Sequence, residues 1–308
     1  MAPDVGVREV VVALDIGGTR VKAALVASDL SVLASSAEPT PPDIGTVLGD
    51  VVESTTRRLV ADLRLQGGEV SLVGCGVVVP GLVDDVAGVG VLSVNLGWRD
   101  LQIRTAVESR MEVPTSVGHD VRSGLVAEAR LGAARGATDA LFVPVGTGIA
   151  GALMLDGSVV AAGGWAGELG HVVVDPQGPE CPCGGRGCLE TIASASAIAR
   201  EYAVRSGRAV DAEEVARLAG DGDPVATAVW GRAVAALADA IVTTVTITGV
   251  DLVMMGGGLT QSGEALLAPL RAEIAARLTF QRPPRLVPAA LGDRAGCLGA
   301  ACLAWDAR

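Results

Sequence analysis

One histidine and three cysteines stand at spacings typical of a zinc site. Nine residues separate His171 from Cys181, one separates Cys181 from Cys183, and four separate Cys183 from Cys188. Three thiolates and one imidazole complete a tetrahedral zinc shell and leave no open position, which is the pattern of a structural zinc site. Cysteines crowded in this way favour a metal over disulfides, with a reduced cysteine-rich loop as the alternative. The sequence therefore predicts one structural Zn²⁺.

Two carboxylates flank this predicted zinc knuckle. Glu168 stands three residues before His171, and Glu190 stands two residues after Cys188. Either glutamate alone could be an ordinary solvated surface acid. A rigid knuckle would hold both in place, however, and carboxylates accept paired hydrogen bonds from neighbouring hydroxyls. Their positions therefore favour recognition of a polyol.

Two glycine-rich turns have the composition of phosphate-binding loops. One comprises Asp15, Gly17, Gly18 and Thr19, and the other comprises residues 146–151 and begins Gly-Thr-Gly. Glycines let backbone N–H groups approach an anion, a threonine adds a hydroxyl, and Asp15 would hold hydrated Mg²⁺. If the two turns face each other across a cleft, they would cradle one triphosphate. Plain structural hairpin turns are the alternative.

The second turn also fits the dinucleotide pattern G-x-G-x-x-G. That fingerprint must open a helix, so that the pyrophosphate meets the helix N-terminus. Here residues 152–155 form a predicted strand that ends in an Asp-Gly turn, which is typical of a hairpin. A nicotinamide site is therefore disfavoured.

The elements around these turns recur along the chain. A strand, a glycine turn and a strand occur at residues 10–26 and again at 141–155, about 130 residues later, which suggests an internal duplication. The hydrophobic periodicity predicts both strands and helices along the rest of the chain. Further strands are expected at 31–34, 70–79, 113–117, 158–161 and 251–255, and helices at 45–66, 121–131, 191–206, 211–219, 223–247, 263–278 and 295–305.

Composition and charge exclude several classes of protein. The 308 residues suggest about two domains, and a half-apolar composition can bury a sizeable core. A net charge of −11 and only seven aromatic residues argue against nucleic acid as a partner. The single lysine, Lys22, does not follow a glycine, so no P-loop is present. No signal peptide or uninterrupted apolar span is apparent, so we expect a cytoplasmic protein that does not bind membranes.

With these features in view, the chain resembles the ROK family of repressors and sugar kinases. The resemblance implies an actin-like, hexokinase-like fold with two duplicated ribonuclease H-like α/β domains and a cleft between them. The expected domains are a smaller one, 1–119 plus 295–308, and a larger one with the knuckle, 120–294. The matching segments, in family order, are Asp15–Thr19, Val79–Gly81, Asn95–Trp98, Gly146–Gly148, Gly167–His171, Cys181–Glu190 and Gly256–Gly258.

The resemblance also implies roles for individual residues. Asp120 would be the general base that accepts the proton of the attacking hydroxyl. His171 would bind zinc through one ring nitrogen and offer the other to the sugar. The residues implied to bind sugar are Gly81, Asn95, His119, Asp120, Glu168, His171 and Glu190. Those implied to bind ATP and its Mg²⁺ are Asp15, Gly17, Gly18, Thr19, Lys22, Gly146, Thr147, Gly148, Gly256, Gly257, Gly258 and Leu259.

His119 departs from the family pattern, in which asparagine usually precedes the catalytic aspartate. Its imidazole would either contact the sugar, with a preference among hexoses and a pH dependence of its own, or pack away from it. The implied activity is ATP-dependent hexose phosphorylation, with glucose to glucose 6-phosphate first. Kinases for N-acetylmannosamine, fructose or allose and a weakly active sugar-binding protein are alternatives. A repressor is disfavoured because only 14 residues precede Asp15. Family members are commonly dimers or tetramers, so a homodimer or homotetramer is expected.

Overall fold

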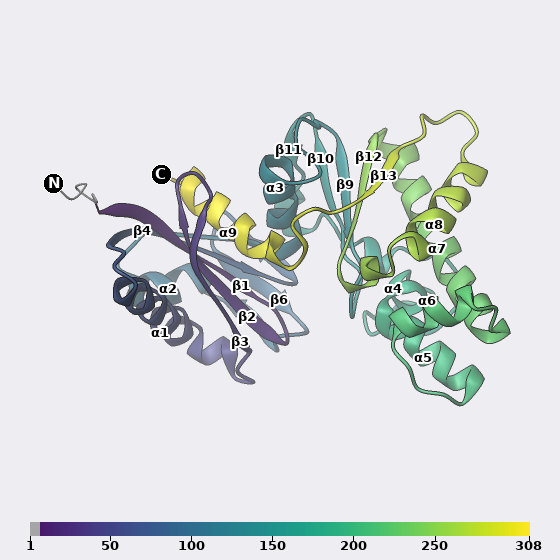
Figure 1. Ribbon diagram of the computed structural model, residues 1–308, viewed down its shortest axis with the longest axis horizontal. Helices are drawn as coiled ribbons and strands as arrows, with labels where there is room; N and C mark the ends of the chain where they lie inside the picture. The colour runs from purple at the N-terminus through teal and green to yellow at the C-terminus, as the bar shows by residue number, and fades with distance from the viewer. Residues whose placement is uncertain (1–6) are drawn as a thin grey trace. The chain divides into compact units, whose positions relative to one another are not determined.

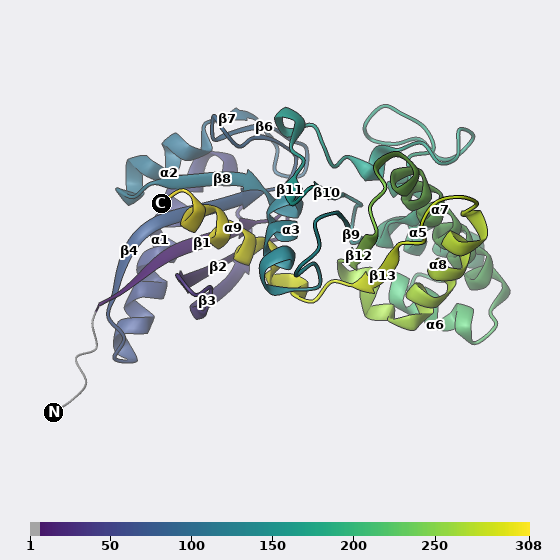
Figure 2. The same ribbon diagram turned by 90° about the horizontal axis from the view of Figure 1, so that it is seen from above.

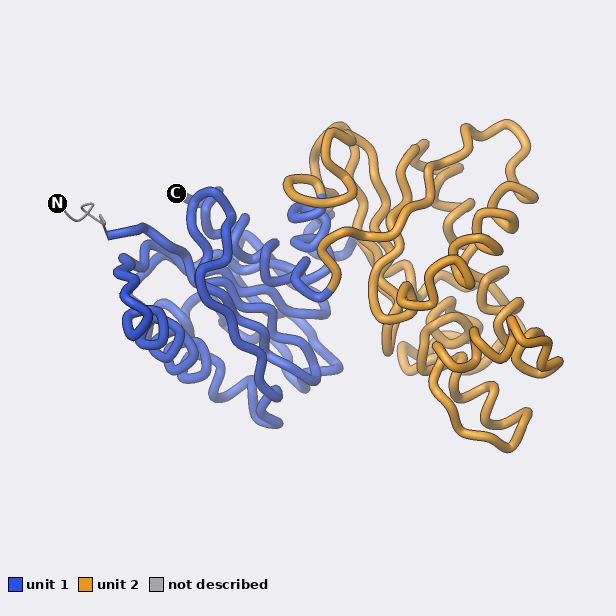
Figure 3. The backbone as a smooth tube through the Cα atoms, viewed as in Figure 1, with its two compact units in different colours: residues 1–128, 161–166, 293–308 blue, residues 129–160, 167–292 orange. Residues whose placement is uncertain are grey.

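The computed structural model describes residues 7–308 and divides into two compact units (Figure 3). In the described residues, unit 1 comprises 7–128, 161–166 and 293–308, and unit 2 comprises 129–160 and 167–292. Residues from both ends of the described chain thus belong to unit 1. The expected division of the domains after residue 119 stays a prediction.

A mixed five-stranded sheet forms the centre of unit 1. Its strand order is β3-β2-β1-β4-β8, in which β1 pairs antiparallel with β2 and parallel with β4. Valine-rich segments supply the central strands because β-branched side chains pack well on a pleated, buried surface. The strands are β1 (Arg8–Ile16), β2 (Arg20–Ala27), β3 (Val32–Pro39), β4 (Val70–Val79) and β8 (Thr115–His119).

Helices cover both faces of this sheet (Figures 1 and 2). Helix α1 (Ile44–Leu65) packs on β2, β3 and α2 (Ile103–Met111), whereas α9 (Ala295–Asp306) packs on β1, β4 and β8. A Cβ atom at Gly76 of β4 would collide with the carbonyl of Ala300, so this glycine allows α9 to lie directly on the strand. Each face of the sheet therefore has its own apolar core.

Unit 1 also contains elements that the sequence pattern did not predict. Strands β5 (Leu82–Asp84), β6 (Val89–Ser93) and β7 (Trp98–Leu101) form a small antiparallel sheet, and α2 follows it. Helix α3 (Asp120–Leu131), which was expected at 121–131, begins directly after β8. The short helical turn η1 (Ala162–Gly164) also belongs to unit 1 and contacts β5.

The sheet of unit 2 repeats the topology of unit 1. Its order is β11-β10-β9-β12-β13. In both sheets the third strand along the chain lies at one edge, and the second, first, fourth and fifth strands follow in that order. This repetition confirms the duplication expected from the two strand–turn–strand segments. The strands are β9 (Ala140–Pro144), β10 (Ala152–Leu155), β11 (Ser158–Val159), β12 (Leu252–Gly256) and β13 (Arg285–Pro288).

The helices of unit 2 enclose one large apolar core. It joins β9 and β12 to helices α4 (Glu190–Ala193), α5 (Ala195–Ser206), α6 (Ala212–Gly220), α7 (Pro224–Thr248) and α8 (Glu264–Arg277). Among the described residues, α7 alone is long and apolar enough to cross a membrane by length and composition, and 56% of its most apolar stretch is buried. This burial is the pattern of a core helix. Two short turns, η2 (Leu169–His171) and η3 (Gly258–Ser262), lie in unit 2, and η4 (Gly292–Arg294) precedes α9.

Candidate functional site

The carboxyl ends of three parallel strands meet at one edge of the unit 1 sheet. Asp15 pairs in register with Val78 of β4, and Val79 pairs with His119 of β8. Asp15 near the end of β1 and Asp120 directly after β8 therefore share this edge, which is where open α/β sheets bind ligands. Two acidic groups so placed suit binding of a cation and removal of a proton.

The surroundings of Asp15 disfavour its charged form. Burial, and next the negative charge of Asp120, raise the pKa of the Asp15 carboxyl to about 7, while Lys22 acts in the opposite direction. Lys22 stands opposite Asp15 in the β1–β2 pair, and its Nζ donates to the Asp293 carbonyl at 3.1 Å. A divalent cation at Asp15 would offset the cost of holding this charge. The residues present therefore fit the Mg²⁺ that the resemblance implies.

Gly296 packs against the carboxylate of Asp15. The sequence had given this glycine no role. An ideal Cβ at Gly296 would lie 2.6 Å from Oδ2 of Asp15, so any larger residue would displace the carboxylate. Gly296 is the second residue of α9, and the positive end of a helix dipole favours an anion there. A sequence signal for this contact was absent because the two residues are 281 positions apart.

The start of α3 fixes Asp120 and its neighbour His119. The His119 side chain is buried, with 5% of the residue exposed, and its Nδ1 accepts hydrogen bonds from the backbone N–H of Val121 at 3.2 Å and of Arg122 at 3.3 Å. Oδ1 of Asp120 also accepts from the N–H of Val121, at 2.7 Å. Asp120 thus sits in a helix start with a defined geometry.

Arg122 is a buried cation that the sequence reasoning did not single out. Only 4% of it is exposed, and its guanidinium donates to Asp85 at 3.0 Å and to the carbonyls of Val83 and Gly164. These bonds attach α3 to β5 and to η1, which stands in the chain shortly before Glu168. In a helical window an arginine ordinarily indicates a solvated face, so its burial had no sequence signal.

The remaining predicted residues of unit 1 lie around this edge. Gly17 and Gly18 belong to the β1–β2 hairpin, in which the N–H of Gly17 donates to the Arg20 carbonyl at 3.0 Å, and Thr19 is exposed there. A Cβ at Gly18 would lie 3.7 Å from Cβ of the exposed Asn95.

Gly81 has a positive φ of 103°, and a Cβ there would collide with the Leu92 carbonyl, so the position requires glycine.

The second glycine turn lies at the equivalent edge of unit 2. The Gly146 carbonyl accepts from the N–H of Ala195 at 2.9 Å, and the Thr147 carbonyl accepts from the Ser196 hydroxyl. Oε2 of Glu190 accepts from the N–H of Ile149 at 3.0 Å and leaves no room for a Cβ at Gly148. The turn is therefore held by the segment that directly follows the cysteines, while Thr147 itself is exposed.

The predicted nucleotide glycines pack against the start of the same turn. The N–H of the buried Leu259 donates to the Val145 carbonyl at 3.1 Å, and a Cβ at Gly257 would collide with that carbonyl. Val145 in turn donates to the Gly256 carbonyl at 2.9 Å, and Gly258 follows at the surface. Unit 2 thus brings the segment that leads into residues 146–148 together with residues 256–259.

The four expected zinc ligands converge in unit 2. One ligand atom from each of His171, Cys181, Cys183 and Cys188 lies within 4.8 Å of the others. Nδ1 of His171 is 3.7 Å from Sγ of Cys181, and its Nε2 is 3.8 Å from a carboxylate oxygen of Glu168. The ring therefore directs one nitrogen to the cluster and the other to a predicted sugar ligand.

The chemistry of this cluster fits a soft divalent metal. Burial raises the pKa of the Cys181 and Cys188 thiols, whereas the backbone N–H of Gly185 lowers that of Cys183. Close thiols that resist losing their protons are stabilised when a cation compensates the thiolate charges. The other three cysteines are buried, and burial raises the pKa of Cys75 to about 12, as expected of inert core thiols.

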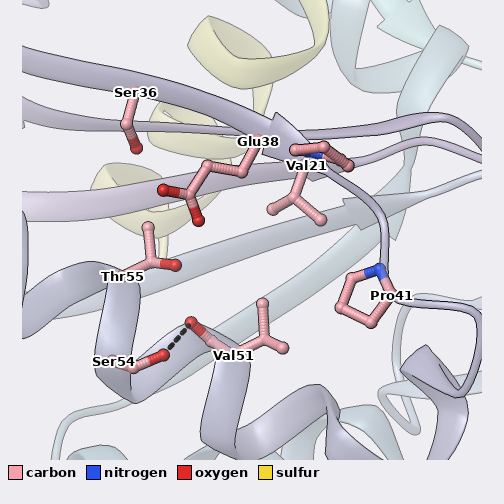
Figure 4. Close-up of a pocket in the computed structure, with 8 residues that line it drawn as sticks. Val21, Ser36, Glu38, Pro41, Val51, Ser54 and Thr55 are labelled. Atoms are coloured by element: carbon pink, nitrogen blue, oxygen red, sulfur yellow. Dashed lines mark hydrogen bonds between the residues drawn. The ribbon is translucent and has the colours of Figure 1, made fainter.

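A small cavity in unit 1 is separate from these groups. It has a volume of about 80 Å³ and lies between β2, β3 and α1 (Figure 4). Its lining includes Ser36, Glu38 and Thr55, and the Ser54 hydroxyl beside it donates to the Val51 carbonyl. None of the predicted site residues lines this cavity, so it has no part in the proposed chemistry.

Comparison with known proteins identifies the family. The sequence profile of the ROK family matches residues 11–307, and the chain belongs to this family. It is 32% identical over 313 residues to the glucokinase of Thermotoga maritima, covering 95% of this chain and 96% of the relative. The resemblance to the ROK family expected from the motifs is therefore confirmed.

Solved structures agree with this assignment. A ROK hexokinase from Thermus thermophilus superposes with a TM-score of 0.81 at 32% identity, covering 97% of this chain and 98% of the other. A ROK glucokinase from Streptomyces griseus, in complex with glucose and AMPPNP, gives a TM-score of 0.80 at 27% identity, covering 96% and 99%. These similarities confirm the predicted actin-like, hexokinase-like fold.

Proposed function

We propose that this protein is an ATP-dependent hexose kinase that converts glucose to glucose 6-phosphate. The curated relatives and the solved glucokinase support the kinase class, as the sequence predicted. The observation that carries the mechanism is the pair of acids at the edge of the unit 1 sheet. Asp120 directly follows β8, and Asp15 is a buried carboxyl near the end of β1, so we assign the base to Asp120 and the cation ligand to Asp15.

Asp120 acts as the general base. Its carboxylate accepts the proton of the attacking sugar hydroxyl while the hydroxyl oxygen bonds to the γ-phosphorus of ATP and the bond to the ADP oxygen breaks. Little other covalent chemistry is needed, because phosphoryl transfer depends mainly on in-line positioning and on charge neutralisation. The helical start that holds Asp120 fixes the carboxylate for this step.

Backbone groups and Asp15 hold the nucleotide. We assign the phosphates to the two glycine turns, with the hydroxyls of Thr19 and Thr147 and the ammonium of Lys22 as further donors. Asp15 would hold the Mg²⁺ that accompanies ATP, and that ion would neutralise phosphate charge. Residues 256–259 lie beside the adenosine.

The predicted sugar ligands are assigned individually. Asn95, Glu168, Glu190 and Nε2 of His171 bind the sugar hydroxyls, and Gly81 leaves room for them. His171, Cys181, Cys183 and Cys188 would hold a structural Zn²⁺, and a metal there would keep Glu168 and Glu190 in place.

We further propose a cytoplasmic homodimer or homotetramer acting in glycolysis, with no nucleic acid or membrane as partner.

The variant Asp120→Asn tests the mechanism, since it keeps the shape of the side chain but accepts no proton. Turnover should fall by roughly 10²–10⁴-fold, and sugar affinity should change far less. A variant that keeps more than about a tenth of the turnover, when chemistry limits the rate, would show that Asp120 is not the base.

A coupled measurement of ADP release over a panel of sugars tests the substrate. Glucose should give the highest kcat/KM among glucose, N-acetylmannosamine, fructose and allose. A higher value for another sugar would replace glucose and leave the kinase class intact, whereas no release with any sugar would favour a sugar-binding protein.

A further inference from the structure

His119 occupies the position that joins a strand to a helix. It is the last residue of β8, and α3 begins at the next residue. A residue in this place is the N-cap of the helix, where a side-chain acceptor bonds the first unsatisfied backbone N–H groups. Serine, threonine, aspartate and asparagine usually supply that acceptor through an oxygen. Here an imidazole nitrogen does so.

The geometry determines which nitrogen carries the proton. Nδ1 of His119 lies 3.2 Å from the N–H of Val121 and 3.3 Å from the N–H of Arg122, and both groups can only donate. Nδ1 must therefore present its lone pair, since a proton there would oppose two fixed donors. In the neutral ring the proton then resides on Nε2.

Asp120 offers Nδ1 a competing interaction. Its Oδ1 lies 3.4 Å from the same nitrogen, so a protonated Nδ1 would donate to the carboxylate instead of capping the helix. Oδ1 already accepts from the N–H of Val121 at 2.7 Å, and this contact is shorter than the 3.4 Å between Oδ1 and Nδ1. The guanidinium of Arg122 bonds Asp85 and several carbonyls, so its contribution to the cap is its backbone N–H. The described contacts therefore favour the capping form.

We propose that His119 is a positioning residue, which caps α3 through an unprotonated Nδ1 and thereby holds Asp120 in its catalytic orientation. The effect on catalysis rests on the proposed role of Asp120 as base, whereas the tautomer does not depend on it. A loss of the cap would loosen the first turn of α3, which carries Asp120. Because small misplacements of a reacting group cost much rate, the step affected is turnover rather than sugar affinity.

Imidazole ¹⁵N resonances test the tautomer directly. The chain has only two histidines, so a His119→Asn variant assigns both spectra by the signal that disappears. At pH 8, long-range ¹H–¹⁵N correlation should show a pyridine-type Nδ1 and a pyrrole-type Nε2 for His119. A protonated Nδ1 in the folded protein would overturn the proposal.

Kinetics with two matched variants test the consequence. Asparagine can accept from the same N–H groups, so His119→Asn should keep kcat within about threefold. Leucine has a similar bulk but no acceptor, so His119→Leu should lower kcat by roughly 10–100-fold while the sugar KM stays within about threefold. A changed KM and a changed order of preferred hexoses in both variants, with kcat retained, would make His119 a sugar contact and refute the positioning role.

Failure of the His119 proposal can be distinguished from failure of the proposed function. If Asp120→Asn retains turnover, the base is misassigned, yet the His119 spectrum still reports the cap. If His119→Leu does not fold, the spectrum of the unmodified protein still decides whether Nδ1 accepts.

Discussion

Replacing Asp15 with asparagine should stabilise the Mg²⁺-free protein at neutral and alkaline pH. The folded protein raises the pKa of this carboxyl from 3.8 to about 7, mainly through burial and the charge of Asp120. The folded state therefore binds the proton more tightly than the unfolded state, and stability falls as pH rises from about 4 through 7. Asparagine has no charge to bury, so it removes this cost.

The size of the expected stabilisation follows from the rise in the pKa of Asp15. At about 1.4 kcal/mol per pKa unit, the charged carboxylate costs about 4 kcal/mol at pH 8 and about 1.5 kcal/mol at pH 5. For a unit of this size, Asp15→Asn should raise Tm by roughly 8–16 °C at pH 8 and by roughly 3–6 °C at pH 5. The gain should thus grow with pH.

Thermal unfolding of both proteins across pH 5–8 measures this gain. The buffer should be free of divalent cations without a chelator, since a chelator would also compete for zinc. Asp293→Asn is the matched control, because that side chain is 97% exposed and its replacement should change stability by less than about 0.5 kcal/mol. Equal Tm values for Asp15→Asn and the unmodified protein at pH 8, or a gain that shrinks as pH rises, would refute the reasoning.

Mg²⁺ with ATP should narrow the difference in stability between the two proteins. A ligand at 100 times its Kd adds about 2.7 kcal/mol to a protein that binds it, and Asp15→Asn lacks the anchoring carboxylate. The unmodified protein should therefore gain more Tm from Mg²⁺-ATP than the variant does, and a gain of equal size would place the cation elsewhere.

Three further substitutions test other contacts. Cys183→Ser should reduce bound zinc from about one per chain to nearly none and lower Tm, as measured by elemental analysis and calorimetry, whereas Cys75→Ala should retain the metal. Gly296→Ala should displace the Asp15 carboxylate and raise the KM for Mg²⁺-ATP by roughly tenfold, while Gly220→Ala, with open space around it, should leave that KM unchanged. Arg122→Met removes hydrogen bonds to carbonyls and to Asp85, so it should lower the free energy of unfolding by about 2–3 kcal/mol. Residues 161–166 should then become accessible to proteases, and an unchanged cleavage pattern would count against the anchoring role of Arg122.

Local patterns made much of the fold predictable. Strand β4 was expected at 70–79 and occurs there, because a short valine-rich segment packs well in a buried sheet. The zinc cluster was predictable for a related reason, since its four ligands lie within 18 residues and their types are unusual. The two glycine turns were visible because each stands between two such strands.

Other features depend on contacts that spacing does not reveal. Strands β5 to β7 have three to five residues each, too few for a periodic signal. The helix expected at 191–206 is broken at Ser194, whose extended backbone and hydroxyl cap α5 by accepting from Ala197. This residue type is tolerated in a helix, so only the geometry of the turn reveals the break.

The cap formed by His119 illustrates a third kind of limit. Its sequence position suggested a choice between a sugar contact and packing away from the sugar, and neither alternative considered the first N–H groups of α3. Histidine is uncommon as an N-cap, so its residue type gave no indication of this role.

The packing of α9 on the first sheet also constrains the order of folding. Cys297 of α9 donates to the carbonyl of Ala13, 284 residues earlier in the chain. At ribosomal rates of about 5–20 residues per second, roughly 14–57 s separate the synthesis of these two segments. During that interval the sheet face formed by Val11, Ala13 and Val78 lacks its covering helix. The nascent chain therefore displays an apolar strand surface for most of its synthesis, a surface that chaperones bind and that would otherwise promote aggregation.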